Sequence, residues 1–123
     1  MDIANEKIFL MIITKDDIYN ITKENTKINY EKLTLILKDF LNSNNLKLED
    51  IQKIYVNRGP GSFAGIRNSL SIVKAINIAR NVDYYCYSIE DFKDQKDIKY
   101  EDIPNLCDKF KIKKNLIKPI YLS

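Results

Sequence analysis

The stretch Arg58-Gly59-Pro60-Gly61-Ser62-Phe63-Ala64-Gly65-Ile66-Arg67 contains every glycine of the chain. It follows a strand-like segment, Ile54-Tyr55-Val56, and opens a helical one. Glycine allows sharp turns and close approaches between backbones. The free N–H groups and the dipole at a helix N-terminus also favour anions. The stretch therefore predicts a tight strand-to-helix turn and a candidate anion or nucleotide loop formed by Gly59, Gly61, Ser62, Gly65 and Arg67.

The glycine stretch has more than one interpretation. The spacing Gly59-x-Gly61-x-x-Ala64 after a strand fits a dinucleotide-binding fingerprint, although no acidic residue ends the next strand. A Walker A loop is excluded, because no Gly-Lys-Ser/Thr follows at the required spacing. In the third interpretation the glycines permit only a turn and close packing of helix on strand, with no ligand.

The composition is typical of one globular domain. The chain has 123 residues, of which 45% are hydrophobic and 30% charged, with a net charge of +3. Charges of both signs alternate along the chain, which favours a mixed solvated surface over a nucleic-acid footprint. No apolar run approaches the roughly 20 residues of a membrane span. We therefore expect a cytoplasmic protein without a membrane partner.

The histidine and cysteine content limits the catalytic and metal-binding chemistry that this chain could perform. Histidine is absent, which excludes histidine-based triads and histidine-ligated metals. Cys86 and Cys107 have no paired spacing and are expected to be reduced, inert thiols. We therefore expect no metal site and no catalytic residues in this chain.

Hydrophobic periodicity and turn residues predict a β-hairpin followed by alternating helices and strands. This order favours a mixed β-sheet with helices packed on it. A charged and polar segment, predicted to be a linker without core-forming residues, precedes the last helix. The expected elements are strands at 7–14, 18–22, 53–57 and 84–87, helices at 29–43 (with Asn29 as N-cap), 63–80 and 104–110, the linker at 93–102, and an extended tail at 117–123.

The predicted helix at 63–80 carries an unusually wide apolar arc. Ile66, Leu70 and Val73 form one apolar face, and residues such as Ile72 and Ile76 form a neighbouring one. Such an arc predicts burial on two sides. The second cover is either another segment of this chain or a partner protein that docks on small residues.

A longer pattern around the glycine stretch resembles a known family. Residues 56–67, followed by Leu70-Ser71 and Lys74-Ala75, are similar to the GRGPGSFTGxRxGLxxxKG signature of the TsaB (YeaZ) family. Residues 2–7, 88–92 and 119–122 resemble that family's IDT(S/A), SSLEAL and PxYLR segments. The resemblance implies a single actin-like ATPase (RNase H-like) lobe of class α/β. Its expected parts are a lobe at 1–92, a polar linker at 93–102, and a short helix and tail at 103–123 that pack on the lobe.

The chain also departs from the family pattern. Family members are longer and have a second lobe before the tail, where this chain has only the linker and one short helix. The first strand is clipped at Asp2, so either the start lies upstream or the sheet edge is missing. Ile3-Ala4 replaces the Thr/Ser that follows the family's Asp, and Asn29-Tyr30-Glu31 stands for its His-Ser-Glu. These losses weaken the case for nucleotide binding more than the case for assembly.

The resemblance implies an accessory, non-catalytic subunit of the tRNA threonylcarbamoyladenosine machinery. Its main partner would be a TsaD-like threonylcarbamoyltransferase, bound as a heterodimer, with a TsaE-like ATPase as a further candidate and tRNA reached only through the complex. The resemblance places ATP and a metal on the TsaD-like partner and no cofactor in this chain. Alternatives are a homodimer when the partner is absent and a stand-alone nucleotide-binding or kinase-like lobe that uses the Gly59–Gly65 loop. The predicted partner interface comprises Leu35, Ser69, Ile72, Val73, Ala75, Ile76 and Ala79.

Overall fold

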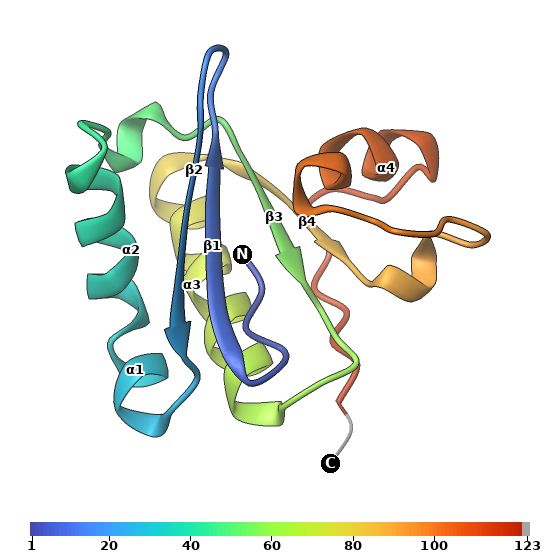
Figure 1. Cartoon of the computed structure of the whole chain (residues 1–123), viewed down its shortest axis with the longest axis horizontal. Helices are drawn as coiled ribbons and strands as arrows, with labels where there is room; N and C mark the ends of the chain where they lie inside the picture. The colour runs from blue at the N-terminus through green and yellow to red at the C-terminus, as the bar shows by residue number, and fades with distance from the viewer. Residues whose placement is uncertain (122–123) are drawn as a thin grey trace.

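Figure 1 shows the computed structural model of the chain, which describes residues 1–121. Strands β1 (Lys7–Ile13) and β2 (Ile18–Glu24) form an antiparallel hairpin. Strands β3 (Lys53–Asn57) and β4 (Asp83–Tyr87) pair in parallel, joined by a crossover through helix α3 (Phe63–Arg80). The predicted β-hairpin and βαβ unit are both confirmed, each to within two residues.

The single mixed sheet that the sequence predicts is replaced by two separate two-stranded sheets. Within residues 1–121, the backbone hydrogen bonds that connect the two sheets are made by Met1 and Asp2. Asp2 exchanges two backbone hydrogen bonds of 2.9 Å with Phe9 of β1, and the Asn57 N–H of β3 donates to the Met1 carbonyl at 3.0 Å. Two residues hold the sheets together at one end but are too few to form a strand along the rest of their length.

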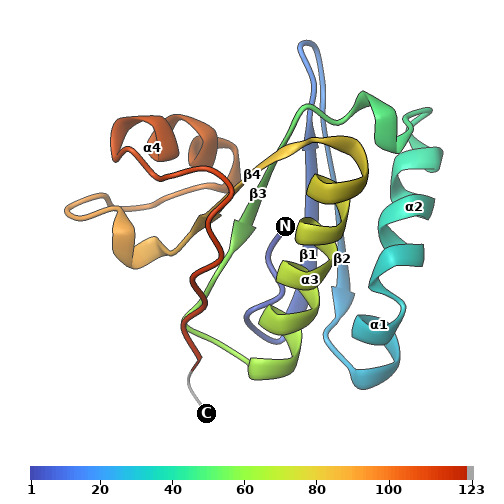
Figure 2. The ribbon, with the colours of Figure 1, turned by 180° about the vertical axis from the view of Figure 1, so that it is seen from behind.

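Three of the helices cover one side of the strands. Helix α3 lies behind the hairpin in Figure 1 and in front of it in Figure 2, with α1 (Lys27–Glu31) and α2 (Leu33–Ser43) beside it. The sequence predicted one helix starting at Asn29, but Thr26 is the N-cap and accepts the Asn29 N–H at 3.3 Å. The backbone of Lys32, with φ −100° and ψ 17°, then separates α1 from α2. Short 3-10 helices lie at Leu48–Asp50, Ile89–Asp91 and Tyr100–Asp102.

The core has three clusters, and the alternation of side chains along a strand explains how two of them share β4. Tyr84 and Cys86 face α3, whereas Tyr87 on the opposite face packs against helix α4 (Ile103–Lys109). A third cluster, which includes Ile8 and Phe40, lies between the hairpin and α2. Helices therefore cover both faces of the β3–β4 pair, as expected of a layered α/β lobe.

The segment at 93–102 does more than link two parts. Its Tyr100 ring stacks on Phe9 with centroids 4.0 Å apart, and the Tyr100 hydroxyl donates to Asp2 Oδ2 at 2.7 Å. Ile98 packs against the cluster under α4. The expectation of a linker without core-forming residues is thus wrong at Ile98, whereas Tyr100 is 37% exposed and anchors the segment without joining a core cluster. The composition of the segment did not predict these two contacts, because Ile98 and Tyr100 are each surrounded in the sequence by charged residues.

Candidate functional site

The glycine turn is packed against two other parts of its own chain. Gly59 has a φ of +112°, and a Cβ there would collide with the Ile120 carbonyl of the tail. A Cβ on Gly61 would collide with the carbonyl and side chain of Ala4, and Gly65 lies in the same way under Ile3. The close backbone approaches that the sequence predicted therefore exist. They are made to the tail and to the N-terminal loop, which occupy the space that the missing side chains leave.

The backbone donors of the turn are also directed at this chain. The Gly59 N–H donates to Asn57 Oδ1 at 2.9 Å, and the Ser62 N–H donates to the Ala4 carbonyl at 2.9 Å. Ser62 is the N-cap of α3, where its Oγ accepts the Gly65 N–H at 3.4 Å. Three donors that could cradle an anion are thus satisfied internally. This arrangement favours the packing interpretation of the glycine stretch over a ligand-binding one.

The three arginines have different surroundings. Arg58 is largely buried and forms a two-pronged pair with Asp91, with Nη2–Oδ1 at 2.6 Å and Nε–Oδ2 at 3.3 Å. Arg80 lies 3.8 Å from Glu49 on the surface. Arg67 is exposed, and its guanidinium lies 5.8 Å from the centre of the Phe63 ring. Of the predicted anion ligands, Ser62 and Arg67 remain at the surface beside the start of α3, and anion binding by them stays a prediction.

The predicted partner interface divides into two groups. Ser69, Val73 and Ile76 are buried in the core of this chain, at 0%, 0% and 7% exposure, so they are not part of its surface. The covering element on that side of α3 is the β3–β4 pair. The prediction that Ser69, Val73 and Ile76 form part of the partner interface is therefore wrong, because the chain's own core buries them.

The other four interface residues do reach the surface. Leu35 is 54% exposed on α2, and Ala75 and Ala79 are exposed one turn apart on α3. Ile72 is half-buried and packs against the clusters on both sides of it. Ile78, which the sequence analysis overlooked, is 74% exposed on α3. Its position on the helical wheel, away from Ile66, Leu70 and Val73, could have identified it.

The cysteines are confirmed as unpaired and buried. Burial raises the pKa of the Cys86 thiol to about 11 and that of Cys107 to about 12. Both thiols are therefore protonated near neutral pH, and the protonated form is a poor nucleophile.

Within residues 1–121, the cysteine and acidic side chains form no group of three or more that could hold a metal ion. None of the helices in the same range has the length and apolar character needed to cross a membrane.

Comparison with known proteins places the chain in a family. The model of the TsaD family, described as tRNA N6-adenosine threonylcarbamoyltransferase, matches residues 24–88, just over half of the chain. A similar curated protein is the "tRNA threonylcarbamoyladenosine biosynthesis protein TsaB" of Buchnera aphidicola subsp. Baizongia pistaciae. It is 29% identical over 75 residues, which cover 61% of this chain and 34% of that protein.

Solved structures agree on the fold. YeaZ from Pseudomonas aeruginosa superimposes with a TM-score of 0.65 at 20% identity, covering 71% of this chain and 41% of that one. A second structure, of a protein with similarity to the peptidase YeaZ from Pseudomonas aeruginosa, gives a TM-score of 0.66 at 20% identity, covering 71% and 40%. The chain thus spans between about a third and two fifths of the length of these relatives. With an actin-like (RNase H-like) lobe and a matching family model, the chain belongs to the tRNA N6-adenosine threonylcarbamoyltransferase family and is a TsaB/YeaZ-like member of it.

Proposed function

We propose that this chain is a non-catalytic accessory subunit in tRNA threonylcarbamoyladenosine biosynthesis. It docks on a TsaD-like threonylcarbamoyltransferase and supports that partner's fold or activity. The name of its curated relative, a tRNA threonylcarbamoyladenosine biosynthesis protein, supports the pathway. The family model that matches residues 24–88 supports a paralogous transferase as the partner, because related lobes commonly associate through equivalent surfaces.

The observation that carries the docking proposal is the outer surface of α2 and α3. Leu35, Ala75, Ile78 and Ala79 present exposed apolar or small side chains there, while other faces of the same helices fill the core. Small residues let a second helix approach closely, and exposed leucine and isoleucine supply apolar area to bury. In this proposal the contact is helix against helix, and tRNA meets this chain only within the complex.

The proposal assigns the reaction to the partner. The chain contains no histidine, and its two thiols are protonated and buried. The N–H groups of Gly59, Ser62 and Gly65 bond within the chain rather than facing a ligand. ATP and a metal are accordingly proposed for the TsaD-like partner, and the glycine turn is proposed to shape the lobe.

A binding titration tests the docking proposal. The chain is titrated into the TsaD-like protein of the same organism by calorimetry, and light scattering gives the mass of the complex. We expect a heterodimer with micromolar affinity or better. Failure of a folded chain to associate would overturn the proposal. A titration with ATP, ADP and Mg²⁺ accompanies it, because micromolar nucleotide affinity without a partner would instead support a stand-alone nucleotide-binding lobe.

Variants locate the surface. Leu35→Asp places a charge on the proposed interface and is expected to weaken the heterodimer by about tenfold or more. Leu116→Asp is the matched control, because Leu116 is 48% exposed, close to the 54% of Leu35, and lies between α4 and the tail rather than on α2 or α3. Equal effects of the two substitutions would move the interface away from these helices. Ile72→Asp is less informative, since Ile72 also packs against the core.

A further inference from the structure

The positive charge of the chain is concentrated in two segments. Helix α3 and residues 109–121, here called the basic segment, together contain eight of the 20 lysines and arginines and none of the 17 acidic residues. The alternation of charges found along the rest of the chain is absent from both, and the rest of the chain is net acidic. Two such segments form one positive surface only if the fold places them side by side.

The basic segment meets both ends of α3. Near the end of the helix, Asn115 Oδ1 accepts a 3.4 Å hydrogen bond from Asn77 Nδ2. At its start, the rings of Phe63 and Tyr121 lie with their centres 4.7 Å apart. Figure 2 shows the end of the basic segment passing in front of β4, on the same side as α3. The segment therefore runs antiparallel to the helix, and the helical and the extended stretch between these contacts each span about 20 Å.

Hydrogen bonds hold the basic segment in this position. The Asn115 N–H donates to the Tyr84 carbonyl of β4 at 2.7 Å. The Ile120 N–H donates to the Arg58 carbonyl at 2.7 Å. The Arg58 side chain in turn donates from Nη1 to the Lys118 carbonyl at 3.1 Å. The segment is thus a fixed part of the surface beside α3.

This surface carries three cations on exposed residues. Arg67 and Lys74 lie about 20° apart on the helical wheel of α3, and Lys118 lies on the basic segment. Within residues 1–121, these three side chains take part in none of the salt bridges of the chain. Lys114, by contrast, lies 3.4 Å from Asp83. Arg67, Lys74 and Lys118 are therefore available to an anionic ligand.

Two aromatic rings lie at one end of this row of cations. Phe63 is 44% exposed and Tyr121 is 39% exposed, and their ring planes are inclined by 51°. Phe63 lies within about 40° of Arg67 and Lys74 on the wheel, so it is on the same side of α3. The Arg67 guanidinium lies 5.8 Å from the centre of the Phe63 ring. Exposed rings and guanidinium planes are the groups on which unpaired nucleobases stack.

The combination of cations and rings selects one class of ligand. Cations attract any polyanion, but exposed aromatic rings add affinity for a strand whose bases are free to stack. In a double helix the bases are stacked inside and out of reach of such rings. An anionic membrane is typically bound by an amphipathic helix, whereas residues 111–121 form no helix. A single-stranded nucleic acid fits both features.

We propose that the surface between α3 and the basic segment binds a single-stranded segment of RNA. An unpaired base stacks on Phe63 or Tyr121 beside Arg67, and the neighbouring phosphates contact Lys74 and Lys118. The choice of RNA over DNA rests on the proposed function, whereas the preference for an unpaired strand rests on the charges and rings. Within the proposed complex this surface adds contacts to the RNA, and in the isolated chain it gives a weak, salt-sensitive affinity.

The RNA surface adjoins the proposed docking surface without sharing a residue with it. Ala75 and Ala79 lie about 100–140° from Lys74 on the wheel, and Leu35 belongs to α2. Ile78, one turn beyond Lys74, marks the boundary between the two surfaces. The backbone N–H groups of the glycine turn bond within the chain and take no part in the RNA surface.

Fluorescence anisotropy with the full chain and a labelled ten-nucleotide oligouridylate tests the proposal. We expect binding at low salt, with a slope of log K against log salt of about −2, because three phosphate contacts each contribute about −0.7. Absence of binding at about 20 mM salt, where such contacts are strongest, would overturn the proposal. No TsaD-like protein is present in this titration, so its outcome is independent of the docking titration.

Paired substitutions locate the surface. Arg67→Gln with Lys118→Gln removes two of the three contacts and should weaken binding by about tenfold or more and reduce the salt slope by about 1.4. The matched control is Lys23→Gln with Lys38→Gln, which removes two exposed lysines from β2 and α2 and leaves the same net charge. It should change the affinity by less than about twofold. Equal effects of the two pairs would show that net charge alone drives binding and would overturn the proposal.

Further comparisons test the stacking and the class of ligand. Phe63→Leu removes a ring but keeps an apolar side chain against Tyr121, and it should weaken binding by about fivefold or more. If circular dichroism shows that this variant does not fold, Tyr121→Leu takes its place. Unchanged affinity in the folded ring variant, or equal affinity for inorganic polyphosphate of matched charge, would overturn the proposal. Binding to phosphatidylserine vesicles without binding to oligouridylate would assign the surface to a membrane and overturn the proposed ligand.

Discussion

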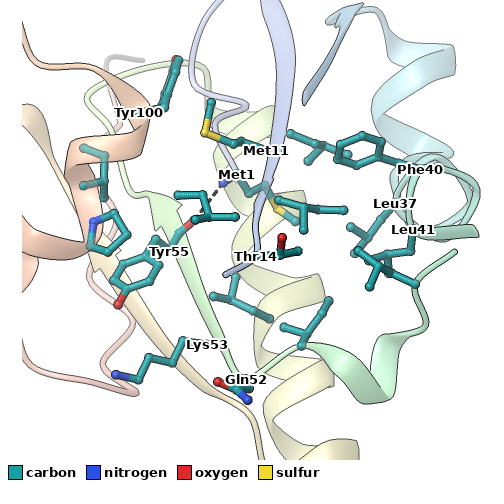
Figure 3. A pocket seen from close by; sticks show the side chains of 18 of the residues that line it. Met1, Met11, Thr14, Leu37, Phe40, Leu41, Gln52, Lys53, Tyr55 and Tyr100 are labelled. Atoms are coloured by element: carbon teal, nitrogen blue, oxygen red, sulfur yellow. Dashed lines mark hydrogen bonds between the residues drawn. The ribbon is translucent and has the colours of Figure 1, made fainter. Parts of the chain in front are cut away.

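The Met1 ammonium donates a 2.8 Å hydrogen bond to the Tyr55 carbonyl oxygen (Figure 3) and is desolvated by the surrounding chain. Burial lowers the pKa of this ammonium from its ordinary value of 8.0 to about 6, and the nearby Asp2 carboxylate only partly opposes the effect. A chain terminus is normally solvated, so this contact places a titrating group inside the fold. The pKa of the Met1 amine therefore depends on the packing of the region between β1 and β3.

The first prediction concerns pH. Between pH 6 and 8 the unfolded chain binds a proton at Met1 that the folded chain does not, so stability should rise with pH across this window. The gain should be about 2–3 kcal/mol, from a pKa difference of two units. Urea unfolding at several pH values measures it. The chain has no histidine, so few other groups titrate there.

N-terminal acetylation is the control for this pH effect, since it removes the titrating amine. The acetylated chain should show a nearly flat stability between pH 6 and 8. A slope that persists after acetylation would assign the effect to another group.

The second prediction concerns the glycine turn. Gly61→Ala places a Cβ against the Ala4 carbonyl and side chain and should lower the free energy of unfolding by about 1–3 kcal/mol. Urea unfolding without any ligand measures this loss. Ser71→Ala, on the exposed side of α3, is the control and should change stability by less than about 0.5 kcal/mol. Undiminished stability of Gly61→Ala would instead favour a ligand-binding role for the glycine.

The third prediction concerns the Arg58–Asp91 pair. Arg58→Met keeps much of the side-chain volume but leaves the largely buried Asp91 carboxylate without its cation. We expect a loss of about 1–3 kcal/mol in thermal or urea unfolding. The control is Lys7→Met, since the side chains of Lys7 and Glu24 are both more than half exposed. Loss of this pair should lower the free energy of unfolding by less than about 1 kcal/mol. Equal losses in both variants would mean that burial of the Arg58 pair is energetically unimportant.

The fourth prediction concerns how the polar segment at 93–102 is anchored. Tyr100→Phe preserves the stacking on Phe9 but removes the hydroxyl that donates to the buried Asp2. The buried Asp2 carboxylate would then keep only the Ala4 N–H as a donor, and the loss should lower the free energy of unfolding by about 1–3 kcal/mol. Tyr19→Phe is the matched control, because the Tyr19 hydroxyl bonds to Asp17 at 3.3 Å on the surface and its loss should be nearly neutral. Amide exchange should also accelerate around residue 100 in Tyr100→Phe only.

Local patterns predicted the elements of the lobe well. The helix at 63–80 and the strand at 53–57 match α3 and β3, because a glycine turn and sustained periodicity mark their ends. The N-cap of α1 was misplaced by three residues, since Thr26 and Asn29 are both acceptable N-caps and only the folded backbone selects one. The side chains of Ser69, Val73 and Ile76 were misassigned because a wide apolar arc does not say which sector faces the sheet.

The sequence by itself determined the order of the elements, the glycine turn and the family signature around it, because each of these features depends on residues that are close together in the chain. Only the tertiary structure decided what the turn packs against, with Ala4 and Ile120 filling the space beside its glycines. It also decided that Asp91 neutralises Arg58 across 33 positions and that Tyr100 reaches Asp2 across 98. The physical reason is that turn chemistry and periodicity act over a few residues, whereas these contacts join distant segments and form only when the whole lobe has closed around its core.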